Sequence, residues 1–168
     1  MLLPAAVLLL ASTPAHAQAL RVSSVEFVTG RAGFVDEAWD SFTMAGGAAR
    51  LQVTPRFALG PEIAYLDGRD GSHGLTITAT GTFDLVATRS DRRVVPFVVF
   101  GAGLLRQTSV VGRGPGRPGL ASYTSSEGTA SGGIGVRIRL SPHWVLAPDV
   151  RLGYEPETRL SLAVAWRP

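Results

Sequence analysis

The sequence of 168 residues contains no cysteine, so a disulfide framework and any thiolate chemistry, catalytic or metal-binding, are excluded. Lysine is absent as well: all 16 basic residues are arginines, set against 13 acidic residues. The arginines are scattered along the chain and do not form runs interleaved with aromatic residues. This distribution argues against nucleic-acid binding.

A long apolar run is missing from everything beyond the first residues. No later stretch approaches the roughly 20 consecutive apolar residues of a membrane-spanning helix. The composition is nevertheless unusually apolar for a soluble protein, with 45% hydrophobic residues, only 17% charged residues and 20 glycines. Mean hydropathy is positive, at +0.20. The chain is therefore apolar overall, but beyond its first residues it contains no segment long enough for a membrane-spanning helix.

Residues 1–17 predict a cleavable secretory signal peptide. Met1 to Leu10 is almost wholly apolar, and Ala15-His16-Ala17 places small side chains at the two positions that a signal peptidase reads. The remaining residues, 18–168, are enough for one domain and too few for two. The sequence thus predicts an exported protein with a single mature domain.

Cleavage after Ala17 has a direct test. We expect the mature protein to begin at or close to Gln18, because Ala15 and Ala17 occupy the small-residue positions before that bond. N-terminal sequencing or the intact mass of the exported protein measures the start. A mature species that retains Met1 would contradict the prediction.

Alternation of apolar and polar residues with a period of two runs through the mature chain. In Leu75–Leu85, leucine, isoleucine, alanine, glycine and phenylalanine fall on one face, and four threonines with Asp84 fall on the other. Such alternation is typical of β-strands with one apolar face. Similar or weaker patterns predict seven further strands, over residues 24–34, 42–54, 56–65, 94–107, 130–140, 146–154 and 160–167.

The connectors between these strands are predicted to alternate in length. Short connectors lie at Thr54-Pro55, at Thr88–Arg93 and at Ser141–His143, and longer ones lie between them, the longest from Gln107 to Gly128. Short turns at one end and longer loops at the other are typical of an outer-membrane barrel. Within the longest connector, Val111–Pro118 is rich in glycine, proline and arginine and is expected to be a mobile loop.

The apolar face is predicted to point outward, into lipid. It carries the bulky side chains, whereas the opposite face carries glycine, alanine, serine and threonine, which fit the small interior of an eight-stranded barrel. The polar face also carries charges of both signs, and we expect them to pair as a network inside the lumen. A soluble barrel or sandwich is the alternative. The network comprises Arg50, Glu62, Asp84, Arg137, Arg139, Asp149 and Arg151.

Several segments resemble the small outer-membrane β-barrel family, the OmpA/OmpX-like eight-stranded proteins. They are Gly60-Pro61-Glu62 before Tyr65, Val95-Pro96-Phe97 before Gly101-Ala102-Gly103, and Gly132–Arg137 followed by Trp144. The resemblance implies an all-β, eight-stranded antiparallel up-and-down transmembrane barrel in the bacterial outer membrane. It also implies contact with outer-membrane lipid and recognition of the C-terminal strand by the barrel assembly machinery. The family usually closes on a terminal aromatic residue, whereas here Trp166 precedes Arg167-Pro168.

Candidate catalytic and metal-binding groups are few. Ser72 and His73 lie near Asp70 in one loop and offer a nucleophile, a base and an orienting acid, but these are also ordinary loop residues. Two separated histidines without cysteine are too few to hold a metal ion, and no phosphate-cradling motif is present. We therefore expect no metal, no cofactor and no enzymatic activity.

The function that the sequence favours is a non-enzymatic outer-membrane barrel with a plugged polar lumen and a structural or surface-interaction role. Its longer loops offer a surface to an extracellular ligand that the sequence does not identify. A narrow porin-like channel is the first alternative, and a lipid-modifying enzyme with His73 at the barrel rim is the second.

Overall fold

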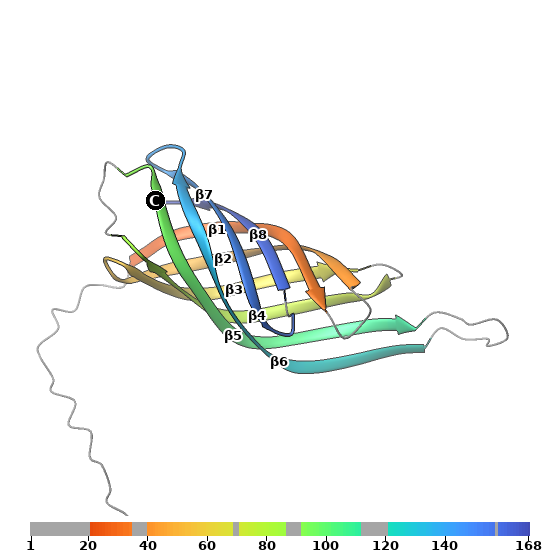
Figure 1. The fold of residues 1–168 in the computed structure, drawn as a ribbon. Helices are drawn as coiled ribbons and strands as arrows, with labels where there is room; N and C mark the ends of the chain where they lie inside the picture. Colours follow the sequence, from red (N-terminus) through yellow and green to blue (C-terminus); the bar gives the residue numbers. More distant parts are fainter. Residues whose placement is uncertain (1–20, 35–39, 69–70, 87–91, 112–120, 157) are drawn as a thin grey trace, which may run out of the picture.

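A computed structural model describes residues 21–34, 40–68, 71–86, 92–111, 121–156 and 158–168 of the chain (Figure 1). The described residues form eight β-strands. They are β1 (Arg21–Phe34), β2 (Asp40–Thr54), β3 (Phe57–Asp67), β4 (His73–Asp84), β5 (Val94–Val111), β6 (Ala121–Arg139), β7 (Trp144–Tyr154) and β8 (Thr158–Trp166).

The strands form a closed barrel in which each strand pairs antiparallel with its neighbours in the sequence. The barrel closes where β1 pairs with β8, from Val25 opposite Trp166 to Gly33 opposite Thr158. Closure leaves no unpaired sheet edge along the shared length of the strands. The predicted eight-stranded, up-and-down antiparallel barrel is therefore confirmed.

The barrel has two unlike ends, which Figure 1 shows at the left and the right. The C-terminus, the β2–β3 and β6–β7 turns, the end of β4 and the start of β5 lie at one end, called here the termini end. The other end, called here the hairpin end, is marked by β5 and β6, which reach beyond the other strands. Pairing of β5 with β6 continues to Val111 opposite Ala121, although β7 ends at Tyr154, opposite Ala130.

The strand lengths correct one prediction. Residues 107–128, expected to be the longest connector, mostly extend β5 and β6, and only residues 112–120 separate the two strands. Tyr123 and Thr124 favour strand geometry and pair with Ser109 and Thr108, so the hairpin persists where its outward face is no longer apolar. The expected mobile segment Val111–Pro118 lies almost wholly outside the described residues.

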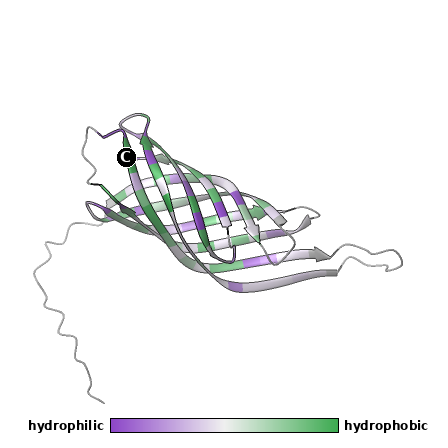
Figure 2. Ribbon diagram, in the orientation of Figure 1, coloured by the Kyte–Doolittle hydropathy of each residue, from purple (hydrophilic) through white to green (hydrophobic). Residues whose placement is uncertain are grey.

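Side-chain direction follows the predicted alternation in each strand. Ile134 and Leu104 on the outer wall are 67% and 66% exposed, whereas Ala64 and Thr80 on the inner wall are fully buried. The alternating colours along the strands in Figure 2 show the same period of two. The apolar residues therefore form the outside of the barrel, as a membrane barrel requires.

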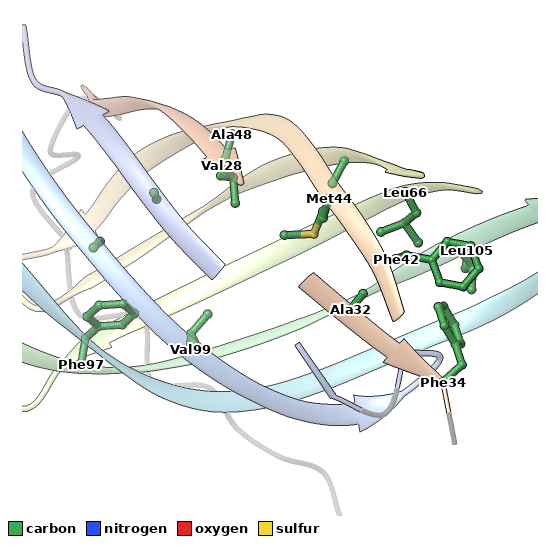
Figure 3. Packing of buried hydrophobic residues seen from close by; sticks show 13 residues of the cluster. Val28, Ala32, Phe34, Phe42, Met44, Ala48, Leu66, Phe97, Val99 and Leu105 are labelled. Atoms are coloured by element: carbon green, nitrogen blue, oxygen red, sulfur yellow. The ribbon is translucent and has the colours of Figure 1, made fainter. Parts of the chain in front are cut away.

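The interior corrects a second prediction, because it is not filled only by small and polar residues. Bulky apolar side chains gather inside the hairpin end, where Phe34 and Phe42 pack edge to face with ring centroids 5.2 Å apart. Figure 3 shows Leu66 and Leu105 beside Phe42. Met44 completes this group, called here the apolar plug, and every member is at most 4% exposed. At this end of the barrel β2 turns Phe42 and Met44 inward and Thr43 and Ala45 outward, while β1, β3 and β5 supply the other members.

Glycine and proline in mid-strand have positional causes. A Cβ on Gly46 would lie 2.1 Å from the backbone oxygen of Ile63, and one on Gly133 would lie 2.0 Å from that of Val150. Only glycine therefore lets these neighbouring strands approach so closely. Pro61 falls where the pairing between β2 and β3 is interrupted, between Glu62 and Leu59, as expected of a residue without an amide to donate to the ladder.

Aromatic residues on the outer wall gather toward both ends. Trp144 pairs with Trp166 across β7 and β8 at the termini end, and Phe57 stacks on Phe100 with centroids 6.0 Å apart. Near the other end, Tyr65 stacks on the ring of His73. Such belts are typical of barrels at the two interfaces of a bilayer. No helix in the described part of the chain is long and apolar enough to cross a membrane.

Candidate functional site

The most concentrated polar feature of the interior is a charge cluster centred on Glu62. This residue lies on β3 in the inward phase and is 1% exposed. Three guanidinium groups surround its carboxylate: Arg50 Nη2 at 2.7 Å, Arg159 Nη2 at 2.5 Å and Arg151 Nη2 at 3.4 Å. They come from β2, β8 and β7, so one carboxylate joins strands on both sides of the barrel closure.

Two further carboxylates balance the positive charge around Glu62. Arg151 Nε donates a hydrogen bond to Asp149 Oδ1 at 2.8 Å, and Ser161 Oγ donates to the same oxygen at 2.9 Å. Glu26 Oε2 lies 3.3 Å from Arg50 Nε. The cluster thus contains three carboxylates and three guanidinium groups, all inside the wall of the barrel.

A second ion pair, between Asp84 and Arg137, lies nearer the termini end. Arg137 also donates a hydrogen bond from Nη2 to Thr82 Oγ1 at 2.7 Å. Its guanidinium carbon stands 4.5 Å from the ring centroid of Phe97, close enough for a cation–π contact. The pair connects β4 and β6 inside the lumen, between the Glu62 cluster and the termini end.

Such a cluster acts as a brace rather than as a reactive site. Each charge loses hydration on burial, and its opposite charges compensate that loss only while they remain in place. The carboxylate of Glu62 contacts three guanidinium groups, so both of its oxygens are occupied by ion pairs. A general acid or base needs a group free to exchange a proton with a substrate, and this arrangement offers none in the cluster.

The structure brings most residues of the sequence-predicted network together but not all of them. Arg50, Glu62, Asp149 and Arg151 share the Glu62 cluster, and Asp84 with Arg137 forms the second pair. Arg139, in contrast, lies in the rim of the termini end, where it lines a hollow with Arg92, Arg93 and Arg167.

Sequence reasoning missed two members of the cluster, Glu26 and Arg159. The signal for Glu26 was available, because it alternates with Val25 and Phe27 in the polar phase of its strand. Arg159 precedes the expected start of the last strand by one residue. It is in phase with Ser161 and Ala163, so the observed start of β8 at Thr158 turns it inward.

The histidine of the suggested rim site contacts the backbone of its own loop and a neighbouring tyrosine. His73 Nδ1 lies 3.0 Å from the backbone oxygen of Gly71, and the ring stacks on Tyr65 with centroids 6.2 Å apart. Asp70, the suggested orienting acid, lies outside the described residues. Among the residues that the structure does describe, no group of three or more potential ligands converges to hold a metal ion.

Comparisons with known proteins identify the fold. No protein-family model and no curated protein sequence matches the chain. Solved structures do match: the surface protein A of Neisseria (NspA; 14% identity, TM-score 0.61) and the N-terminal β-barrel domain of Pseudomonas aeruginosa OprF (17%, 0.60). Each alignment covers 86% of this chain and at least 95% of the other.

A third neighbour is the attachment invasion locus protein Ail of Yersinia pestis, with 13% identity and a TM-score of 0.53. The alignment covers 87% of this chain and 97% of Ail. All three are small β-barrels of the same size as this chain. At these identities the likeness establishes the shared fold, and the function has to be argued from the residues of this chain.

Proposed function

We propose that this chain is a non-enzymatic β-barrel of the bacterial outer membrane whose lumen is closed and whose protruding hairpin serves surface interactions. The neighbours in fold are outer-membrane barrels, which supports this location. A cleavable signal peptide over residues 1–17 provides export, and β8, which ends at Trp166, provides the strand that the barrel assembly machinery recognises.

The outer wall supports placement in lipid. Large apolar side chains are exposed around the barrel, among them Phe27 at 58%, Ile77 at 51% and Leu160 at 59%. A soluble protein rarely exposes so continuous an apolar surface. The aromatic residues toward both ends of this wall correspond to the two bilayer interfaces, and the C-terminus then faces the periplasm.

The observation that carries the proposal is the two-layer filling of the lumen. The Glu62 cluster crosses the barrel from β3 to β7 and β8, and the apolar plug fills the interior toward the hairpin end. An eight-stranded barrel has an interior that side chains are able to fill completely. An ion entering such a lumen would have to separate buried ion pairs and then cross an apolar layer, so we infer that the barrel does not conduct.

The protruding hairpin supports a role at the cell surface. β6 continues over residues 121–129 beyond the end of β7, and β5 continues over Ser109–Val111 beyond the end of β4, with the two strands still paired as far as Val111 opposite Ala121. Its exposed side chains include Ser122, Tyr123 and Thr124, which suit contact with water and with a partner. The name of one neighbour, the attachment invasion locus protein, describes such a role for a barrel of this fold.

Closure of the lumen predicts an electrical result. The purified barrel, inserted into a planar lipid bilayer, is expected to show little or no steady conductance, because the Glu62 cluster and the apolar plug occupy its cross-section. Substituting Phe42→Ala and Met44→Ala together removes part of the plug and is expected to produce small, fluctuating conductances.

A barrel with substitutions only on the protruding hairpin, such as Ser126→Ala, is the matched control and should remain silent. Large, stable, ohmic currents from the unmodified protein would contradict the closed lumen. They would instead favour a narrow porin-like channel as its function.

A further inference from the structure

A series of small hollows leads from the termini end into the lumen. The first two lie near the rim and share Asp84, Arg137 and Arg167 in their linings, the third lies against the Glu62 cluster, and Arg137 lines all three. Space for the centre of a water molecule amounts to about 10, 30 and 20 Å³ in turn. Each therefore has room for roughly one or two water molecules. We call this series the vestibule.

The vestibule is closed at its inner end. Behind the third hollow stand Glu62 and its arginines, and beyond them the apolar plug fills the hairpin end. In the third hollow a solute from the termini end meets Asp149 and Arg151 beside apolar side chains such as Phe97, and the interior beyond them is filled. The shape suits binding rather than transport.

The mouth of the vestibule concentrates positive charge. Arg92 and Arg93 approach it from the β4–β5 connector, Arg139 from the end of β6, and Arg167 from the residue after β8. Arg56, in the β2–β3 turn, lines the second hollow. The carboxylate that lines the first two hollows belongs to Asp84, which already pairs with Arg137.

This crowding has an electrostatic cost. Burial lowers the pKa of the Arg167 guanidinium below its ordinary value and the positive charge of Arg139 lowers it further, while the carboxylate of Glu26 offsets part of this effect. Like charges held together in a partly enclosed mouth repel one another, and an anion among them relieves the repulsion. The barrel closure assembles these arginines from four separate places in the sequence, between residues 56 and 167.

We propose that the vestibule mouth binds a small oxyanion of the phosphate class. Guanidinium groups donate paired hydrogen bonds that match the oxygens of phosphate, and several of them converge here from different sides. The small hollows exclude a bulky ligand from the interior. The phosphate is supplied either by a free anion in solution or by the headgroup of a phospholipid in the leaflet at this end, which the Trp144–Trp166 pair marks on the outer wall.

The test is a titration of the barrel folded in a maltoside detergent, which contains no phosphate. Inorganic phosphate is added at constant ionic strength against chloride, and binding heat is measured by calorimetry. We expect saturable binding of one phosphate per barrel. The double substitution Arg93→Gln with Arg167→Gln should weaken it by at least about tenfold, because it removes two charge-assisted donors.

The matched control is Arg31→Gln with Arg106→Gln, which removes two exposed arginines from the outer wall toward the hairpin end and should leave phosphate affinity unchanged. Migration of unheated samples on a gel confirms that each variant is folded. Absence of saturable phosphate binding to the unmodified barrel, or equal binding by the Arg93/Arg167 variant, would overturn the proposal.

A second titration, in nanodiscs of phosphatidylglycerol, distinguishes the two sources of phosphate. An affinity for inorganic phosphate at least about tenfold below that in detergent identifies a lipid headgroup as the occupant, and an equal affinity identifies a free anion. The inference assumes the closed lumen of the proposed function. Failure of the phosphate proposal can be told apart from failure of the closed lumen, because a barrel that does not bind phosphate would still show no conductance in a planar bilayer.

Discussion

Replacing Glu62 by glutamine is expected to destabilise the folded barrel by about 3–5 kcal/mol, the range observed when one partner of a buried ion pair is removed. The substitution preserves side-chain size but removes the negative charge that three arginines share, at 2.5, 2.7 and 3.4 Å. Arg50, Arg151 and Arg159 then face only Glu26 and Asp149. The measurement is urea unfolding in lipid vesicles, followed by fluorescence of Trp144 and Trp166.

Glu127→Gln is the matched control, because this glutamate lies on the exposed part of the β6 strand. The control should unfold at the same urea concentration as the unmodified barrel. A second test adds Arg159→Met to Glu62→Gln, which removes one of the uncompensated cations and should recover part of the lost stability. Unchanged stability of Glu62→Gln would show that the cluster does not brace the barrel.

Replacing Ile77 by arginine is expected to reduce insertion and folding severely, with a cost of about 2–4 kcal/mol if the side chain lies near the centre of the bilayer. Ile77 points outward from β4 and is 51% exposed, between Ile63 on β3 and Leu104 on β5. Phe83 lies toward one end of the same strand and His73 toward the other, which places Ile77 between the two aromatic belts. Folding yield into vesicles, read from heat-modifiable gel migration, measures the effect.

Ser126→Arg provides the comparison, because Ser126 also points outward but lies on the protruding hairpin, beyond the end of β7. An arginine there remains in water and should cost little. Cell fractionation of both variants adds a reading in the organism. If the two substitutions reduced folding equally, or Ser126→Arg did so more, the apolar band would not be the lipid-facing surface.

The sequence by itself determined that eight segments form strands and, where apolar and polar residues alternate, which way their side chains point. In a strand the direction of a side chain depends only on its own position, so Thr78 and Ile77 separate to opposite walls without reference to any other strand. Bulky residues on one phase and small or charged residues on the other then fixed the barrel as inside-out. For the same reason the sequence places Glu26 on the inward, polar face of its strand, although it does not show that Glu26 pairs with Arg50.

The lengths of the strands and the side chains that fill the interior could be known only from the tertiary structure. The continuation of β5 and β6 through residues expected to be a connector depends on pairing between the two strands, which local composition does not reveal. Phe42 and Met44 point inward and leave small residues on the outer side of this part of β2. This inverts the usual pattern of bulky residues outside and small residues inside, so the sequence pattern of the strand is weak. Space for these large side chains exists because other strands contribute glycine and alanine nearby.

The charge pairing was decided by barrel closure. Glu62 and Arg151 are separated by 89 positions in the sequence and meet across the lumen, whereas Arg139, in phase with Arg137, ends at the rim. Which opposite charges meet depends on strand register and tilt around a closed sheet, and a single strand carries no information about either. The sequence therefore determined the two walls of the barrel, and the three-dimensional closure decided which residues face one another inside it.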